Sequence, residues 1–271
     1  MKRLILALVA AVLPVVGQAQ AVTVKGSDTM VILAQRWAEN YMKSNAGKRV
    51  QVTGGGSGIG IAALINGTTD VANASRPMKE AEKAKVRDRF NILPAEIAVA
   101  RDGLAVYVQE SNPIEQLTLG QLRSIYAGDV KNWKDVGGPD APIILYSREN
   151  SSGTYVFFKD NVLMGDDFAA TAQTLPGTAA VVNAVAKEKF GIGYGGAAYA
   201  KGVKEVKLVG KDGKAYLPSA ENVAKGVYPL SRNLFMYTRG KPSGEAKAFI
   251  DYCLSAEGQG IVTQVGYFPV K

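Results

Sequence analysis

Short apolar runs alternate with longer amphipathic segments along the first quarter of the chain. Residues 21–26 (AVTVKG), 50–53 (VQVT) and 69–75 (TDVANAS) have the length and composition of strands. Residues 30–44 and 61–67 carry apolar side chains at the spacing of a helix. Each strand ends in a turn rich in Gly or Ser, and the next helix begins there. This alternation predicts an α/β protein with open, mostly parallel sheets.

Two long extended stretches interrupt this alternation in the rest of the chain. Residues 97–108 are predicted to form two extended halves joined by Arg-Asp-Gly, and residues 228–238 a single extended stretch. We expect both to carry the chain from one lobe to another. Residues 201–226 are predicted to form a peripheral strand and loop, and residues 246–270 one closing helix and a tail. Further strands are expected at 143–147 and 190–196, and further helices at 79–89, within 117–138, at 154–164 and at 179–188.

The chain begins with the layout of a cleavable secretory signal peptide. Lys2 and Arg3 precede an apolar run at residues 4–16, and small residues follow that run. The run is too short to span a membrane as a helix. Cleavage after Ala19 or Ala21 meets the requirement for small residues. We therefore expect export to the periplasm.

The composition excludes several classes of function. The 271 residues contain no histidine, which removes Ser-His and Cys-His nucleophile pairs and histidine-ligated metals. We therefore expect neither an enzyme nor a cofactor. The single cysteine, Cys253, lies in an apolar segment typical of a buried helix face. Loss of Lys2 and Arg3 with the leader leaves a formal charge of 8 − 2 = +6. The basic residues of the chain are scattered, so nucleic-acid binding is not expected.

Hydroxyl-rich turns follow four of the predicted strands. They read GSDTM at 26–30, GGGSGIG at 54–60, NASRP at 73–77 and RENSSGT at 148–154. Ligands of open α/β sheets bind at the carboxyl ends of strands, where helix N-termini offer unpaired N–H groups and partial positive charge. Hydroxyls add neutral donors, and arginine adds a countercharge with two-pronged geometry. Together the four turns predict a site for a small tetrahedral oxyanion.

The first three turns also have local interpretations. One of the residues 27–29 can cap a helix, and Ser75 can cap another with Arg76 at the surface. The turn at 54–60 can be a packing turn or a dinucleotide loop, because its glycines fit G-x-G-x-x-A after a strand. No acidic residue ends a following strand at the distance that a dinucleotide site needs. The joint occurrence at four strand ends favours the oxyanion site.

The fourth turn has a local interpretation of its own. Ser151 or Ser152 can cap the helix that follows, while Arg148 pairs with Glu149 or with a distant acid. A helix N-terminus that no protein side chain covers is itself an anion site, so the two interpretations are compatible. We assign Ser151 to local capping. Glu149 is expected to point to the far side of Arg148, to solvent or to the proton of the anion.

These motifs resemble those of the periplasmic phosphate-binding proteins of phosphate ABC transporters over nearly the whole mature chain. The markers are VTVKGSDTM, GGGSG, TDVANASRP, LRSIYAGDVKNWKDVGG, SRENSSGTYVFF and GIGYGGAAYA. The resemblance implies a two-lobed α/β fold of the type II periplasmic binding proteins, with two open mixed sheets flanked by helices and joined by a two-strand hinge. The corresponding division is a signal peptide (1–21), a first lobe (22–101 and 230–271) and a second lobe (102–229). A monomer that captures phosphate and delivers it to an ABC permease is implied as well.

The resemblance also implies which residues bind phosphate. Most supply hydroxyls or backbone N–H groups, and one supplies a guanidinium. The first-lobe positions are Ser27, Thr29, Met30, Ser57 and Ser75, and the second-lobe positions are Arg148, Ser152, Gly153 and Thr154.

Ser75 departs from the family pattern, in which an aspartate after the third strand accepts the proton of phosphate. Sulfate has no proton near neutral pH, so a buried acceptor favours phosphate over sulfate. Asp28 is our first candidate for the acceptor and Glu149 the second, and Arg76 is a further possible site residue. Two alternatives stay open: another tetrahedral oxyanion (molybdate, tungstate, sulfate or a phosphonate), or a phosphate-sensing or surface-interaction role. A secreted phosphatase is a third, which the absence of histidine disfavours.

Overall fold

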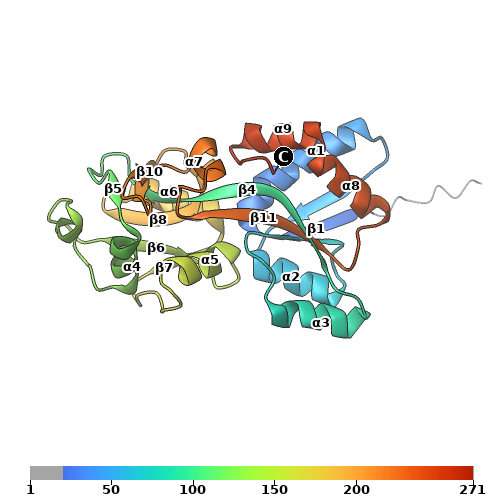
Figure 1. Ribbon diagram of the computed structural model, residues 1–271, viewed down its shortest axis with the longest axis horizontal. Coiled ribbons are helices and arrows are strands. Elements are labelled where there is room, and N and C mark those ends of the chain that lie inside the picture. The colour runs from blue at the N-terminus through green and yellow to red at the C-terminus, as the bar shows by residue number, and fades with distance from the viewer. Residues whose placement is uncertain (1–20, 271) are drawn as a thin grey trace, which may run out of the picture.

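The computed structural model describes residues 21–270, which form two lobes connected by long strands (Figure 1). The strand order is β2-β1-β3-β11-β4-β8-β6-β7, so a single path of paired strands runs through both lobes. Residues 1–20, which hold nearly all of the expected signal peptide, and residue 271 lie outside the described residues. Within residues 21–270, no helix combines the length and the apolar character needed to cross a membrane.

Three parallel strands lie side by side at one end of the sheet in the first lobe, as the sequence predicted. β1 (Val22–Gly26) pairs with β2 (Val50–Thr53) on one side and with β3 (Val71–Ala74) on the other. Their apolar residues are buried, and all four residues of β3 are buried because helices cover both faces of the sheet. The carboxyl ends of the three strands therefore meet at one edge.

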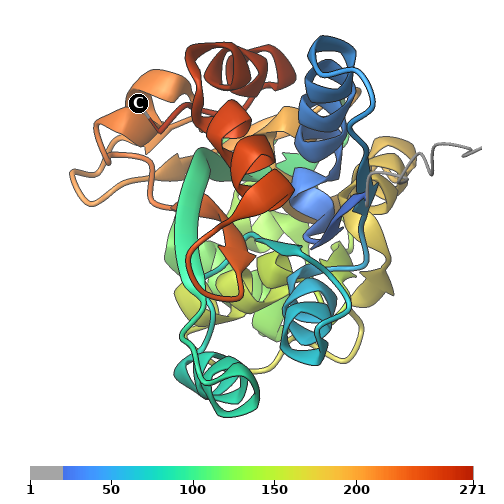
Figure 2. The same cartoon turned by 90° about the vertical axis from the view of Figure 1, so that its right-hand side faces the viewer.

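Helices cover the two faces of this sheet (Figure 1, Figure 2). Trp37 is fully buried under one set of helices, and its Nε1 donates to the Gly258 carbonyl at 2.7 Å, which joins two helices that are distant in sequence. One face carries α1 (Val31–Ser44), α8 (Gly244–Leu254) and α9 (Ala256–Val265), and the other carries α2 (Ser57–Asn66) and α3 (Glu80–Phe90).

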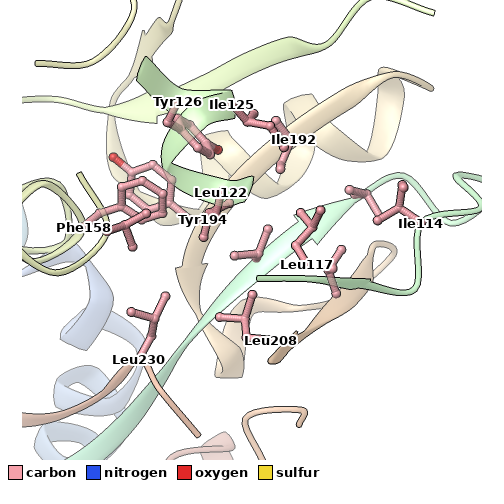
Figure 3. Packing of buried hydrophobic residues seen from close by; sticks show 14 of the residues in the cluster. Ile114, Leu117, Leu122, Ile125, Tyr126, Phe158, Ile192, Tyr194, Leu208 and Leu230 are labelled. Carbon is pink, nitrogen blue, oxygen red and sulfur yellow. The ribbon is translucent and has the colours of Figure 1, made fainter. Parts of the chain in front are cut away.

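The second lobe is built around another set of parallel strands. β6 (Ile144–Arg148) pairs in parallel with β7 (Gln173–Leu175) and β8 (Gly191–Gly196). Its core contains stacked aromatic rings (Figure 3), with the rings of Phe158 and Tyr194 4.0 Å apart between centroids. The helices of this lobe are α4 (Leu119–Ala127), α5 (Gly153–Asn161), α6 (Gly177–Lys187) and α7 (Ala220–Ala224).

Two antiparallel strands connect the lobes. β4 (Ala95–Val108) pairs with β11 (Ser231–Thr238) along its first part and with β8 along its second part. β11 also pairs with β3 of the first lobe. These are the two extended stretches that the sequence predicted to cross between lobes, although the first is one continuous strand rather than two halves.

The C-terminal segment differs from the sequence prediction of a single helix. α8 and α9 are separate helices, because the backbone of Ser255 is extended between them and its Oγ accepts from the Gly258 N–H at 3.1 Å. α2 also begins earlier than predicted, directly after Gly56, whose φ of 97° favours glycine. The remaining strands are the short β5 (Gln116–Leu117) and β10 (Ala215–Tyr216), and β9 (Lys204–Val209), which pairs with both of them and with β4.

Candidate functional site

The four hydroxyl-rich turns meet where the two lobes face each other. Thr29 Oγ1 of the first lobe lies 2.9 Å from Thr154 Oγ1 of the second, and both side chains are buried. The Gly58 N–H donates to the Ser151 carbonyl at 2.8 Å. Strands β1, β2, β3 and β6 all end at this junction, so their turns converge although they are far apart in sequence. The structure describes the lobes in contact, in a closed arrangement.

Arg148 is the central charged residue of the junction. It is the last residue of β6 and is 1% exposed. Its Nη1 donates to Thr178 Oγ1 at 2.8 Å, and its Nη2 donates to Asp28 Oδ2 at 2.9 Å. Burial lowers the pKa of Arg148 below its ordinary value, while the charge of Asp28 opposes that shift. Its buried Nε has no hydrogen-bond partner among the described residues, so one donor of the guanidinium is free for a ligand.

Asp28 lies at the site, on the first lobe. Its Oδ2 accepts from Arg148, its Oδ1 accepts from the Gly55 N–H at 2.7 Å, and its backbone carbonyl accepts from the Tyr199 hydroxyl at 2.7 Å. The sequence left open whether Arg148 pairs with Glu149 or with a distant acid. In the structure its partner is the distant acid Asp28. This ion pair spans the two lobes, so its charges attract each other only when the lobes are closed.

The serine hydroxyls of the junction already accept hydrogen bonds from the backbone. Ser57 Oγ accepts from the Ser75 N–H at 3.0 Å and lies 3.3 Å from Ser75 Oγ. Ser152 Oγ accepts from the N–H groups of Thr154 and Tyr155 at 3.1 and 3.3 Å. A hydroxyl whose oxygen accepts in this way keeps its hydrogen available to donate. Such a lining suits a ligand that mostly accepts hydrogen bonds, which is the character of an oxyanion.

Gly153 allows the two lobes to approach closely. A Cβ at this position would lie 2.3 Å from Ser57 Oγ and 2.7 Å from Ser75 Oγ. Gly56 plays the same role from the other side, since a Cβ there would lie 2.6 Å from the Ser151 carbonyl oxygen. Only residues without a side chain fit these two positions in the closed arrangement.

The structure corrects the assignment of the helix cap. Ser152, not Ser151, caps α5 with its side chain, because its extended backbone places Oγ over the first N–H groups of the helix. Ser151 instead contributes its carbonyl to the contact between lobes. Ser152 therefore caps the helix whose first residue, Gly153, meets the other lobe, although the sequence had suggested Ser151 for the cap.

Other predicted residues have different surroundings. Arg76 is buried rather than at the surface, and its guanidinium makes two hydrogen bonds to the Glu82 carboxylate at 2.7 and 2.8 Å. Glu149 is exposed, which matches the solvent-facing option among those the sequence left open. Ser27 and Met30 are buried beside Thr29, and the Met30 N–H donates to the Ser27 carbonyl at 3.0 Å within the turn.

The sequence interpretation missed an ion pair between the connecting strands. Arg232 on β11 lies directly opposite Asp102 on β4, and its Nε and Nη2 donate to Asp102 Oδ2 at 3.0 and 2.8 Å. Burial raises the pKa of Asp102 above its ordinary value, and the Arg232 guanidinium acts against that rise. Charged residues inside two largely apolar extended stretches, Asp102 next to Arg101 in the first and Arg232 in the second, were the signal that could have indicated this pair.

The described part of the chain offers no metal centre. Among residues 21–270 there is no group of three or more Cys, Asp or Glu side chains arranged to hold a metal ion. What the junction offers to a ligand is two arginine–aspartate pairs, a set of hydroxyls and the first turn of α5.

Comparison with known proteins identifies relatives over almost the whole chain. Residues 10–257 match the PBP superfamily domain. The phosphate-binding protein PstS of Pseudomonas aeruginosa is 36% identical over 263 residues, covering 90% of this chain and 81% of that protein. PstS of Staphylococcus epidermidis is 35% identical over 245 residues, covering 87% and 74%.

A solved structure is similar over a comparable range. It is the crystal structure of a putative phosphate ABC transporter substrate-binding protein with bound phosphate from Clostridium perfringens. It superposes with a TM-score of 0.84 at 31% identity, covering 93% of this chain and all of the other.

Proposed function

Since the chain belongs to the PBP superfamily, and within it to the phosphate-binding proteins of the PstS type, we propose that it binds inorganic phosphate between its two lobes. The observation that carries this proposal is the ion pair of Arg148 with Asp28 across the junction, surrounded by hydroxyls that have hydrogens to donate. Phosphate accepts hydrogen bonds on all four oxygens, and such a lining supplies donors to match.

The proposed ligands come from both lobes. Arg148 supplies the charged donor through its free Nε, and the hydroxyls of Thr29 and Thr154 turn from each other to the anion. Bonds from a charged donor contribute about 1.5–3 kcal/mol each. The full proposed set is Ser27, Thr29, Met30, Ser57, Ser75, Arg148, Ser152, Gly153 and Thr154, with Asp28 as acceptor of the phosphate proton.

Phosphate is proposed to stabilise the closed form. An anion bound to Arg148 and Thr29 at once bridges the two lobes, so it shifts the hinge equilibrium toward the closed form. For the hinge we propose β4 and β11, with residues 22–101 and 230–271 in the first lobe and 102–229 in the second. The closed monomer, exported to the periplasm after removal of residues 1–21, would then deliver phosphate to the membrane subunits of an ABC permease.

Replacement of Arg148 tests the assignment of the site. Arg148→Ala is expected to weaken phosphate binding by about tenfold or more, because the loss of one charged donor is equivalent to at least ~1.4 kcal/mol. The matched control is Arg123→Ala, an exposed arginine of the same lobe that pairs with Asp166. Calorimetry that finds the same dissociation constant for Arg148→Ala and the wild type would falsify the proposed site.

A second candidate ligand is another tetrahedral oxyanion. The observation in its favour is that the Asp28 carboxylate already accepts from Arg148 and from Gly55, while the other nearby position, Ser75, has no carboxylate. A site without a free carboxylate does not repel sulfate. Competition calorimetry with phosphate, sulfate and molybdate distinguishes the two candidates.

A further inference from the structure

A second arginine reaches the junction from the connecting strands. Arg232 is on β11, 8% exposed, and has contacts beyond its partner Asp102. Its Nη1 donates to the Ser75 carbonyl of the first lobe at 3.2 Å, and its Nη2 donates to Thr154 Oγ1 of the second lobe at 3.0 Å. Its guanidinium also lies 5.2 Å from the centre of the Phe157 ring. Arg232 is thus a residue of the hinge that touches both sides of the proposed phosphate site.

The contact with Thr154 fixes the direction of a hydrogen bond. A guanidinium can only donate, so Thr154 Oγ1 must accept from Arg232. The hydrogen of the Thr154 hydroxyl must then point away from Arg232, and Thr29 Oγ1, 2.9 Å away, is one atom that can accept it. When an anion is present, the same hydrogen can turn to it. Arg232 therefore favours Thr154 as a donor toward the junction between the lobes.

The charge of Arg232 has a separate partner. Asp102 is completely buried beside it, and the two form a pair with net charge zero. Arg148 is balanced in the same way by Asp28. Two pairs of zero net charge add little net positive potential at the junction, so attraction for the anion depends on how the donors are aimed. This makes the orientation of Thr154 more important than the charge of Arg232.

We propose that Arg232 is a positioning residue for phosphate, acting through Thr154 to hold that hydroxyl as a donor. This inference rests on the proposed phosphate site. It differs from a purely structural role, in which Arg232 only neutralises Asp102 within the hinge. A structural role predicts the same loss of affinity whether or not residue 154 has a hydroxyl. The positioning role predicts that the loss depends on that hydroxyl.

The test is a double-mutant cycle measured by phosphate calorimetry. The first change is Arg232→Gln together with Asp102→Asn, which removes both charges and leaves no buried ion unpaired. It is expected to weaken phosphate binding about tenfold in the wild-type background and less than about twofold in a Thr154→Val background. In a Thr154→Ser background, which keeps the hydroxyl, the loss is expected to return to about tenfold.

A second variant keeps the test valid if the protein with both Arg232→Gln and Asp102→Asn does not fold. Arg232→Lys retains the charge opposite Asp102, but an ammonium group cannot donate to Asp102 and Thr154 together as the planar guanidinium does. The loss of phosphate affinity is therefore again expected to be large when residue 154 has a hydroxyl and small in the Thr154→Val background. Arg239→Gln is the control, because this arginine follows β11 at its other end and donates to the Thr69 carbonyl.

The outcomes separate the two claims. Equal losses in the Thr154→Val and wild-type backgrounds, or no loss in either, overturn the role of Arg232 while phosphate binding stands. Absence of phosphate binding by the wild-type protein overturns the proposed function, and the role of Arg232 with it.

Discussion

Gly153→Ala separates closure of the lobes from folding of the chain. The added methyl group would lie 2.3 Å from Ser57 Oγ and 2.9 Å from Ser57 Cβ, atoms of the opposite lobe. Ordinary contact begins near 3.4 Å, so the lobes must separate by about 3.4 − 2.3 = 1.1 Å, or Ser57 must leave its hydrogen bond with the Ser75 N–H.

The size of the effect follows from the cost of overpacking, which is typically about 1–3 kcal/mol. Because that cost falls on the closed form alone, it weakens phosphate binding by about 5- to 150-fold. The folded lobes themselves are not affected, since Gly153 is the first residue of α5 and alanine is favoured over glycine in a helix. The thermal unfolding temperature without phosphate should therefore not fall.

Three measurements check this prediction. Calorimetry gives the phosphate affinity, thermal unfolding gives the stability, and small-angle X-ray scattering shows whether phosphate still reduces the radius of gyration. The matched control is Gly120→Ala, in the first turn of α4, where a Cβ would lie 3.8 Å from its nearest neighbour. Wild-type affinity in Gly153→Ala would refute the claim that phosphate is held between closed lobes.

Three further predictions address individual residues. Asp28→Asn is expected to reduce the preference for phosphate over sulfate, measured by competition calorimetry; an unchanged preference excludes Asp28 as the proton acceptor. Ser152→Ala should lower the free energy of unfolding without phosphate by about 1 kcal/mol in urea denaturation, because two N–H groups of α5 lose their cap; unchanged stability contradicts that cap. Burial and the charge of Asp102 raise the pKa of Glu205 to about 7, so the folded state holds a proton that the unfolded chain releases at lower pH. Glu205→Gln should thus be more stable than the wild type by about 1 kcal/mol above pH ~7 and equally stable near pH ~4, as denaturation at both values would show.

The sequence predicted the parts of the site that depend on local pattern. Strands β1, β2, β3 and β6 end in turns rich in Gly, Ser and Thr, and this is visible in short stretches of sequence. The four turns could be assigned to one site because parallel strands place their carboxyl ends together, and the resemblance to the phosphate-binding proteins singled out Thr29 and Thr154 within them. Their contact at 2.9 Å required the closed arrangement of the lobes, which no local pattern contains.

The parts that could not be predicted depend on pairings between distant segments. Arg232 meets Asp102 only because of the register between β11 and β4. The buried position of Arg76 depends on a shorter-range pairing, with Glu82 in the first turn of α3, six residues later in the chain. The break between α8 and α9 is different: Ser255 caps α9, and serine favours that position over a helix interior, so the sequence held this signal although we predicted a single helix.

Titration of phosphate into the purified protein shows whether the junction between the lobes binds this anion. We expect one phosphate to bind per chain, with a heat signal that an excess of sulfate does not abolish, and we expect native mass spectrometry to identify the bound anion. Saturable binding of sulfate or molybdate to the same protein, with no binding of phosphate, would contradict this expectation.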